Sequence, residues 1–178
     1  MNTPRQEAQG GQVPVNIAIL VVSDTRTLAT DTSGQTLEAR IVDAGHCVVE
    51  RRIVPDDVAR IRNAVSEWIA DPQVDVVIST GGTGLTERDV TPEAVRPLLD
   101  KVIEGFSVIF HQVSFKSVGL STLQSRAFAG LASGTFVFCL PGSRGAVKDG
   151  WDHVIVHQLD SRYRPCNLVE LMPRLAGR

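Results

Sequence analysis

The sequence predicts an α/β protein, a three-layer sandwich in which a mostly parallel central sheet lies between two layers of helices. Three observations support this prediction. Four segments have the apolar, β-branched or aromatic composition of buried strands. Between them lie segments whose apolar residues recur at the three- and four-residue spacing of helices. Strands and helices therefore alternate, and right-handed connections would make the sheet mostly parallel.

The first third of the chain predicts a strand, a helix and a second strand. Val15 to Val22 is apolar almost throughout, as expected of a strand that is buried on both faces. The polar stretch from Ser23 to Ser33 follows, and Gly34 to Ala44 then has the apolar spacing of a helix. Gly45 is suited to ending that helix, because glycine adopts the left-handed conformation without steric cost. His46 to Val54 is the second predicted strand.

The middle of the chain continues the alternation. Pro55 to Asp57 is a turn that begins a helix, and the apolar stripe from Val58 to Ile69 continues that helix. Val74 to Ile78 is the third predicted strand. Pro92 to Val102 is predicted to be helical, although Pro97 cannot donate a backbone hydrogen bond inside a helix.

The last third contains the least certain pattern and the clearest strand. Phe106 to Val118 fits either a helix or a strand, and we favour a helix. Leu123 to Leu131 is predicted to form another helix. Thr135 to Leu140 is the fourth strand, because Pro and Gly stop it directly. Ala146 to Leu159 is the last predicted helix, and the tail from Ser161 is mostly irregular.

Length and composition exclude several classes of protein. The chain has 178 residues, and we expect a single domain over residues 14–178 after a disordered lead-in at 1–13. The formal net charge of −2 gives no support to a general nucleic-acid binder. No apolar run approaches the roughly 20 residues of a membrane span, and the N-terminus lacks the apolar core of a signal peptide. We expect no membrane or nucleic-acid partner.

The cysteines favour a reducing environment. Cys47, Cys139 and Cys166 are odd in number, and no two of them have the spacing of metal ligands. Cys47 and Cys139 fall within predicted strands, where they are expected to be small core residues. The protein is therefore predicted to be cytoplasmic.

Four polar or glycine-rich loops follow the four predicted strands. In a parallel sheet the carboxyl ends of the strands meet at one edge, and ligands bind beyond that edge. The loops are Ser23–Ser33, Val54–Asp57, Thr80–Asp89 and Pro141–Gly145. We expect them to form one composite site.

The most informative loop is Thr80-Gly81-Gly82-Thr83-Gly84. Its three glycines would expose backbone N–H groups that can hold an anion such as phosphate. The loop lacks the Lys-Ser/Thr of a P-loop and does not fit G-x-G-x-x-G, so a tight strand-to-helix turn is the alternative. Thr91 is expected to cap the helix that begins at Pro92, whereas Asp89 has no obvious structural role.

Asp56 and Asp89 are candidate ligands of Mg²⁺. If they meet across the edge of the sheet, their carboxylates could hold the ion between substrate phosphates. The alternative for Asp56 is a helix N-cap. Asp57 could take that capping role and leave Asp56 free, and the sequence does not decide between them.

The remaining candidates each have a structural alternative. Ser23 and Asp24 could bind a polar ligand or simply form a turn. Gly142 permits close backbone approach, while Ser143 could contact a ligand or cap the next helix. His153 and His157 are four residues apart, but no third metal ligand lies nearby in the sequence. The chain has no Gly-x-Ser-x-Gly motif, so an α/β-hydrolase nucleophile is missing.

Taken together, these motifs resemble the MoaB/MogA family of molybdenum cofactor biosynthesis proteins. The matching segments are Val22–Asp24, Asp31–Gly34, Val54–Asp56, Thr80–Gly84, Arg88–Glu93, Glu104–Phe106, Ser121–Arg126, Leu140–Ser143, Gln158–Asp160 and Arg164–Asn167. The segments Ser-Thr-Leu-Gln-Ser-Arg, Pro-Gly-Ser and Arg-Pro-Cys-Asn point to the MoaB branch. The resemblance extends from about Val15 to Leu171.

The resemblance implies a molybdopterin-binding fold that assembles as a trimer or hexamer, with other proteins of the pathway as possible partners. Its active members transfer AMP from Mg-ATP to the terminal phosphate of molybdopterin. Asp56 and Asp89 match the two functionally important acids and would organise Mg²⁺ and the phosphates. The implied substrate-binding residues are Ser23, Asp24, Thr80, Gly81, Gly82, Thr83, Gly84, Ser121, Ser125, Pro141, Gly142 and Ser143.

The sequence departs from the family pattern after the Pro-Gly segment. Family members often have a lysine shortly after it, whereas this chain has Arg144, and Lys148 follows further on. Arg144 could act as the phosphate clamp, although Arg and Lys differ in geometry. Some MoaB-branch members have lost one or both acids and are inactive as adenylyltransferases. Retention of Asp56 and Asp89 favours an enzyme over a non-catalytic molybdopterin-binding carrier.

Overall fold

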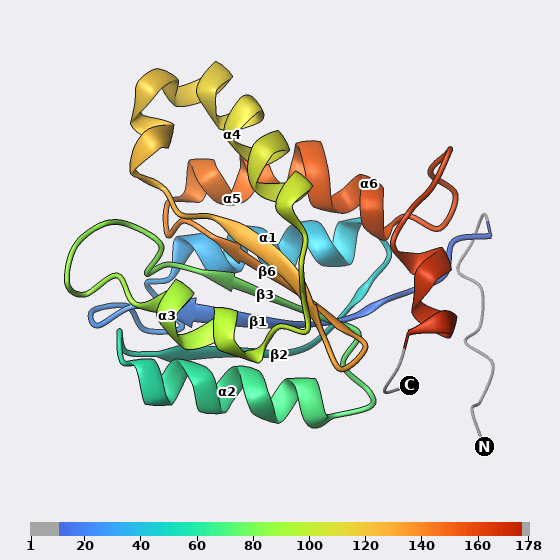
Figure 1. Cartoon of the computed structure of the whole chain (residues 1–178), viewed down its shortest axis with the longest axis horizontal. Helices are drawn as coiled ribbons and strands as arrows, with labels where there is room; N and C mark the ends of the chain where they lie inside the picture. Colours follow the sequence, from blue (N-terminus) through green and yellow to red (C-terminus); the bar gives the residue numbers. More distant parts are fainter. Residues whose placement is uncertain (1–10, 176–178) are drawn as a thin grey trace.

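A six-stranded mixed sheet forms the centre of the protein in the computed structural model, which describes residues 11–175. The strand order is β2-β1-β3-β6-β5-β4, and helices cover both faces of the sheet (Figure 1). The strands are β1 (Asn16–Val22), β2 (Cys47–Val54), β3 (Val76–Thr80), β4 (Lys101–Val102), β5 (Phe128–Ala132) and β6 (Thr135–Leu140). The predicted three-layer α/β architecture is confirmed.

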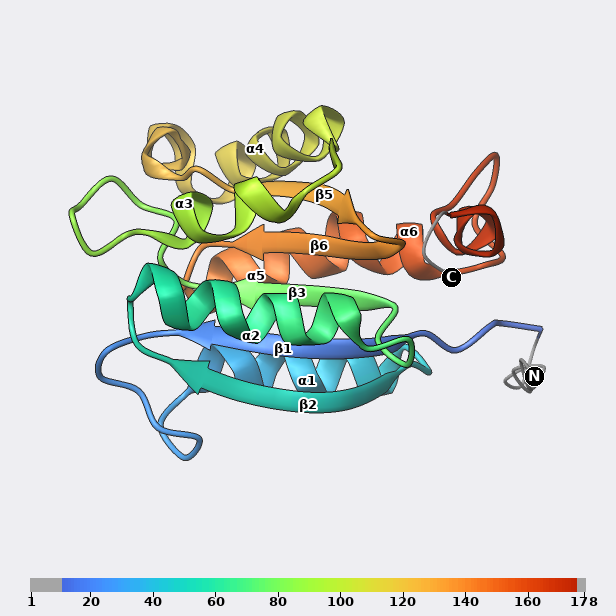
Figure 2. The same cartoon turned by 60° about the horizontal axis from the view of Figure 1, so that its bottom comes forward.

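The helices are divided between the two faces. Figure 2 shows α2 and α3 on one face of the sheet and α1, α5 and α6 on the other. The α-helices are α1 (Thr32–Asp43), α2 (Val58–Ala70), α3 (Thr91–Val95), α4 (Glu104–Val118), α5 (Arg144–Gly150) and α6 (Val156–Leu159). Shorter helical segments are η1 (Arg96–Leu98), η2 (Gly119–Gln124), the π-helical η3 (Trp151–Ile155) and η4 (Val169–Arg174).

Four strands run parallel, and this arrangement creates the edge at which the predicted loops meet. β1 pairs in parallel with β2 and β3, and β3 pairs in parallel with β6. Thr80 is in register with Val21 on one side and Leu140 on the other. The loops that follow these strands therefore leave the sheet side by side. β5 is antiparallel to both β6 and β4, so the sheet is mixed at that end.

Alternating residues of β1 face two separate cores. Ile17 and Ile19 pack with α1, α4 and α5 on one face, whereas Ala18 and Leu20 pack with α2 and α3 on the other. All four residues are fully buried. Complete burial of an isoleucine or leucine stabilises the fold by roughly 1.5–3 kcal/mol. The continuous apolar sequence of β1 is therefore explained by helices on both faces.

The helix predicted over Leu123–Leu131 is wrong. This segment ends the 3₁₀ helix η2 and then forms β5, which pairs with β6 across a tight turn. Ser133 and Gly134 occupy the turn with φ of 46° and 88°, the left-handed conformation of a hairpin. The Ser-Gly pair was thus the local signal of a hairpin, and strand pairing decided the structure of the residues before it.

Two other helical predictions are partly corrected. The helix predicted from Pro92 to Val102 ends as α3 at Val95, and η1 and the short strand β4 follow it. Pro97 lies within η1 and supplies no N–H to continue the helix. Phe106 to Val118 is helical as favoured, because it forms most of α4. The helix predicted over Ala146–Leu159 is interrupted by the π-helical segment η3.

Cys47 is exposed, contrary to the prediction, because β2 is an edge strand whose first residues are not covered. Cys139 is buried as expected, and burial raises the pKa of its thiol to about 12. The predicted disordered lead-in lies outside the described residues as far as residue 10. Gln12 is already packed, because it is buried and its side chain donates to the carbonyl of Ala44. Among residues 11–175, no helix is long and apolar enough to cross a membrane.

Candidate functional site

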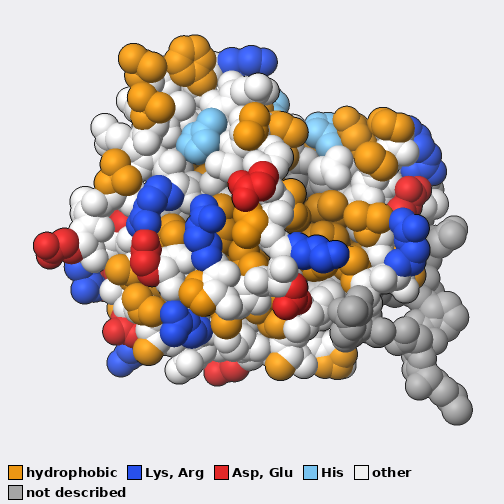
Figure 3. All heavy atoms as spheres, in the orientation of Figure 1, with side chains coloured by type: hydrophobic (Ala, Val, Ile, Leu, Met, Phe, Trp, Pro, Cys, Tyr) orange, Lys and Arg blue, Asp and Glu red, His pale blue; other side chains and the backbone are white. Residues whose placement is uncertain are grey.

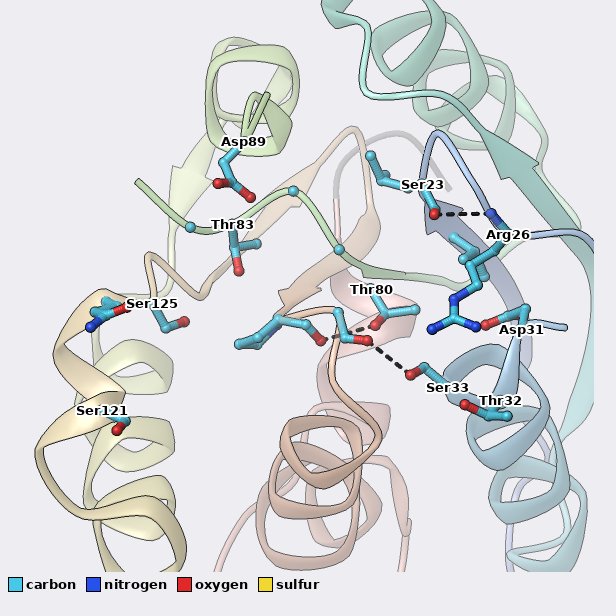
Figure 4. Close-up of a pocket in the computed structure, with 18 residues that line it drawn as sticks. Ser23, Arg26, Asp31, Thr32, Ser33, Thr80, Thr83, Asp89, Ser121 and Ser125 are labelled. Carbon is cyan, nitrogen blue, oxygen red and sulfur yellow. Dashed lines mark hydrogen bonds between the residues drawn. The ribbon is translucent and has the colours of Figure 1, made fainter. Parts of the chain in front are cut away.

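A cavity of about 440 Å³ lies beyond the carboxyl ends of β1, β3 and β6. Its walls come from three of the four predicted loops and from η2. Figure 4 shows Ser121 and Ser125 on one side of the cavity and Arg26, Asp31, Thr32 and Ser33 on the other. The lining residues are Val21, Val22, Ser23, Arg26, Asp31, Thr32, Ser33, Thr80, Gly81, Gly82, Thr83, Gly84, Asp89, Ser121, Gln124, Ser125, Pro141 and Gly142. Eleven of the predicted site residues are therefore brought together.

The glycine loop requires its glycines. Gly81 and Gly82 have φ of 108° and 65°, which L side chains rarely adopt. A Cβ on Gly81 would lie 2.2 Å from the carbonyl oxygen of Val22. Within residues 11–175, the backbone N–H groups of Gly82 and Thr83 donate to no protein acceptor. The loop therefore has two backbone donors without a protein partner, and both of their residues line the cavity.

Both predicted acids lie against the glycine loop, and each carboxylate is close to a different glycine. A Cβ on Gly82 would lie 3.2 Å from Oδ1 of Asp56, and a Cβ on Gly84 would lie 2.7 Å from Oδ2 of Asp89. Asp89 lines the cavity, whereas Asp56 reaches the loop from the end of β2 and is not among the lining residues. The side-chain-free surface of the glycines therefore lets two carboxylates approach one stretch of backbone.

Asp57, and not Asp56, caps α2. Oδ1 of Asp57 accepts a hydrogen bond of 2.9 Å from the N–H of Arg60, which leaves the Asp56 carboxylate available for another role. Burial raises the pKa of Asp56, and the negative charge of Asp24 adds to this effect, while Arg88 opposes it. Asp89 raises the pKa further, so the two predicted acids interact electrostatically. A cation placed near Asp56 would relieve this repulsion.

The prediction that Asp89 has no structural role is wrong. Its Oδ2 accepts hydrogen bonds from the N–H and the hydroxyl of Thr86, at 2.9 and 2.6 Å. Burial opposes its ionisation, but bonds from Thr86 and Gly84 and the charge of Arg126 lower the pKa of Asp89 overall. Asp89 is therefore ionised and oriented by its own loop.

Thr91 also has a different role from the one predicted. α3 has no side-chain N-cap, and the hydroxyl of Thr91 instead donates to the carbonyl of Gly81 at 2.8 Å. The N–H of Thr91 donates to the carbonyl of Gly82 at 2.9 Å. Thr91 is fully buried and fastens the glycine loop to the start of the helix.

Asp24 lies outside the cavity and connects neighbouring loops. It forms an ion pair with Arg88, with Nη2 2.6 Å from Oδ2, and accepts a hydrogen bond from the N–H of Asp56. The hydrogen bond from Arg88 is the main reason that the pKa of Asp24 is lowered. Ser23 lines the cavity and also forms the turn that was its alternative role, because its hydroxyl accepts from the N–H groups of Thr25 and Arg26.

The loop after β6 also divides between lining and structural residues. Gly142 approaches the glycine loop so closely that its Cβ would lie 3.2 Å from Cα of Gly81. Thr80 donates to the carbonyl of Pro141 at 2.9 Å. Ser143 caps α5 through the N–H of Ala146, and neither it nor Arg144 lines the cavity. The two loops therefore form one continuous wall.

Sequence reasoning did not select five polar residues that line the cavity. They are Arg26, Asp31, Thr32, Ser33 and Gln124. Asp31 is buried, caps α1 and pairs with Arg51 at 2.9 Å. Ser33 donates to the carbonyl of Gly142 at 2.9 Å. The Asp-Thr-Ser-Gly motif at the start of a predicted helix was the available signal for three of them.

The acids fit a metal ion that keeps substrate or water ligands. Within the described part of the chain, no group of three or more His, Cys, Asp or Glu side chains could hold a metal alone. His153 and His157 belong to no such group. Mg²⁺ is commonly bound by one or two carboxylates together with substrate phosphates. Asp56 and Asp89 therefore have the right chemistry for Mg²⁺ that arrives with a phosphorylated substrate.

Comparison with known proteins shows the family of this chain. Residues 18–161 match the family described as a probable molybdopterin binding domain. The molybdenum cofactor biosynthesis protein B of Escherichia coli K12 is 50% identical over 155 residues, which cover 87% of this chain and 91% of that protein. The Bacillus subtilis protein of the same name is 40% identical over 146 residues, covering 82% and 86%.

Solved structures show the same fold. A crystal structure of molybdenum cofactor biosynthesis protein B has a TM-score of 0.80 and 44% identity, covering 82% of this chain and 91% of that one. The tungsten cofactor synthesizing protein MoaB from Pyrococcus furiosus has a TM-score of 0.71 and 36% identity, with 78% and 89% covered.

Proposed function

The chain belongs to the molybdopterin-binding family of molybdenum cofactor biosynthesis proteins, and on this premise we propose that it adenylylates molybdopterin with Mg-ATP. The observation that carries the proposal is the approach of two carboxylates, Asp56 and Asp89, to one glycine loop with free N–H donors. A site that only binds the pterin needs the donors but has no need of two acids whose charges repel.

The proposed reaction joins two phosphates. An oxygen of the terminal phosphate of molybdopterin attacks the α-phosphorus of ATP, and a new P–O bond forms. The bond from the α-phosphorus to the oxygen that bridges to the β-phosphate breaks, and pyrophosphate leaves with that oxygen. Such transfers need positioning and charge neutralisation more than a protein nucleophile.

Each side chain has a defined part in this proposal. The free N–H groups of Gly82 and Thr83 would hold the pterin phosphate at the loop. Asp56 and Asp89 would hold Mg²⁺, which neutralises charge on the reacting phosphates when it is bound. Within residues 11–175, Arg26 is the only basic residue that lines the cavity, and it lies on the side opposite Ser121. We assign it to an anionic group of either substrate.

The direct test is incubation of the purified protein with molybdopterin, Mg²⁺ and ATP, followed by chromatographic detection of adenylylated molybdopterin and pyrophosphate. Asp56→Asn and Asp89→Asn should each reduce turnover by about 100-fold or more. Molybdopterin binding should largely persist, because the N–H donors remain. Absence of product from the wild-type protein, with intact pterin binding, would refute the enzyme and support a non-catalytic molybdopterin-binding carrier.

We further propose that the protein assembles as a homo-oligomer through α4 and η2. Figure 3 shows hydrophobic side chains gathered at the top of the molecule, over these two elements. Phe106 and Phe110 of α4 are buried in the core, so the exposed apolar side chains of these elements are others: Val108, Ile109, Phe115, Val118, Leu120 and Leu123. Contiguous exposed apolar surface of this kind marks protein contacts.

The oligomer has its own test. A trimer or hexamer measured by light scattering would support the proposal, and a monomer at micromolar concentration would refute it. The reducing cytoplasm remains the proposed location, and other proteins of the pathway remain proposed partners. The proposed adenylylation does not depend on the location or on these partners.

A further inference from the structure

We propose that Arg126 is a positioning residue that fixes the loop segment Gly84–Asp89 and thereby the Asp89 carboxylate. The inference rests on the proposed function, since it concerns the acid expected to hold Mg²⁺. Arg126 does not line the cavity, although its neighbour Ser125 does. We therefore assign it a role through Asp89 and not through contact with a ligand in that cavity.

One side chain joins both ends of the segment. Nε of Arg126 donates to the carbonyl of Gly84 at 2.8 Å, and Nη2 donates to the carbonyl of Asp89 at 2.6 Å. The backbone N–H of Arg126 donates to the carbonyl of Thr83 at 2.8 Å. An ion pair with Glu93 holds the guanidinium from the side of α3. The connection between η2 and β5 is thus fastened to the glycine loop.

The segment has little else to hold it. Residues 85–88 are exposed, so apolar packing contributes little to their position. The contacts of Asp89 with Thr86 lie inside the segment and move with it. The other ion pair of the segment joins Arg88 to Asp24. The two side chains are 65% and 39% exposed, respectively, and such exposed pairs stabilise a protein by only about 0–1 kcal/mol. Arg126 is about two-thirds buried and supplies the directed bonds.

The geometry is specific to arginine. A planar guanidinium has five N–H donors in a fixed fork, so it can satisfy two carbonyls and a carboxylate at once. Lysine keeps the charge but has a single ammonium group, which cannot reach both Gly84 and Asp89 in the same way. Arg126→Lys therefore removes the fork and preserves the charge.

Arg62 provides a matched control. Its Nε donates to the carbonyl of Ala94 at 3.2 Å, and its Nη2 donates to the carbonyl of Glu93 at 3.1 Å. Arg62 thus bonds α3, the helix that Arg126 contacts through Glu93, but it has no hydrogen bond to the segment Gly84–Asp89. Loss of stability alone should therefore affect Arg62→Lys and Arg126→Lys similarly.

The first measurement is hydrogen exchange of the free protein. Arg126→Lys should accelerate exchange of the amides of Thr86 and Asp89, which donate hydrogen bonds within the segment, by about 10-fold or more, which corresponds to the loss of at least one net hydrogen bond. Amides of β1, β3 and β6 should be unchanged. Arg62→Lys should leave the amides of Thr86 and Asp89 at the wild-type rate. Unchanged exchange of these amides in a folded Arg126→Lys protein would overturn the proposal.

The second measurement is the dependence of adenylylation on Mg²⁺. Groups that orient a metal ligand typically change metal affinity or activity by 10–100-fold. Arg126→Lys should raise the Mg²⁺ concentration for half-maximal turnover by about 10-fold or more, with molybdopterin affinity unchanged. Glu93→Gln keeps Arg126 but removes its anchor, so it should move the same parameter less. An unchanged Mg²⁺ requirement in both variants would also overturn the proposal.

The two measurements separate failure of this inference from failure of the proposed function. If the wild-type protein makes no adenylylated product, the proposed function fails. Hydrogen exchange, together with calorimetric titration of Mg²⁺ in the presence of molybdopterin, still tests Arg126. Wild-type exchange or wild-type Mg²⁺ affinity in Arg126→Lys would then refute the positioning role on its own.

Discussion

Gly84→Ala should disable the Asp89 carboxylate without disrupting the fold. Gly84 does not have the positive φ of Gly81 and Gly82, so alanine can adopt its backbone conformation. Its Cβ would lie 2.7 Å from Oδ2 and 2.9 Å from Cγ of Asp89. Because ordinary contact begins at about 3.4 Å, the carboxylate must move by about 0.7 Å. That movement would weaken one or both bonds from Thr86.

The expected cost to stability is modest and the cost to turnover is large. Loss of one or two hydrogen bonds corresponds to about 1–2 kcal/mol of unfolding free energy. A misplacement approaching 1 Å at a reacting group can reduce the rate by about 10–100-fold. Urea denaturation measures the first quantity, and adenylylation at saturating Mg²⁺ and ATP measures the second.

A second glycine supplies the control. Gly145 in α5 has no atom within 4 Å of its potential Cβ, so Gly145→Ala should stabilise the protein by up to about 1 kcal/mol and leave turnover unchanged. Wild-type turnover in Gly84→Ala would refute the reasoning, as would a crystal structure of that variant with Asp89 in its original place.

Three further predictions follow from the same loops. Because burial and the charge of Asp24 raise the pKa of Asp56 above its usual 3.8, ionised Asp56 destabilises the folded protein. Its favourable contribution is complete below pH 3.8 and is lost as the pH rises through the folded-state pKa. Asp56→Asn should therefore melt at a higher temperature than the wild-type protein at pH 7, with the gap narrowing towards pH 3.8 in calorimetry. An equal difference in melting temperature at both pH values would show that the ionisation of Asp56 is not the cause. Asp57→Ala removes the cap of α2 and should lower the unfolding free energy by about 1 kcal/mol, measured by urea denaturation. Arg26→Gln removes the cavity's basic side chain and should weaken binding of molybdopterin or ATP by about 10-fold in calorimetry with unchanged stability, since Arg26 is exposed.

The parallel strands and the edge of the site could be predicted from the sequence because their signals are local. Val15 to Val22 is apolar on both faces, and only a strand covered on both sides satisfies that pattern. The loops after the four strands then had to meet, since parallel strands share a carboxyl edge. The prediction for Leu123–Leu131 was wrong because its apolar run fits two structures, and pairing with β6 decided between them.

In the site, too, some features could be predicted from the sequence and others depend on the tertiary structure. The sequence by itself predicted that Thr80–Gly84, Asp56 and Asp89 lie at one edge of the sheet, because the glycines and both acids follow predicted strands of a parallel sheet. Only the tertiary structure showed that Asp57 is the cap, that Asp89 is held by Thr86, and that Arg126 fastens the segment from outside. The first two contacts join residues three apart, and the sequence offers more than one possible role for each acid, so the folded backbone decides between them. The contact of Arg126 with Asp89 joins residues 37 apart, which the packing of the chain brings together and no local pattern encodes.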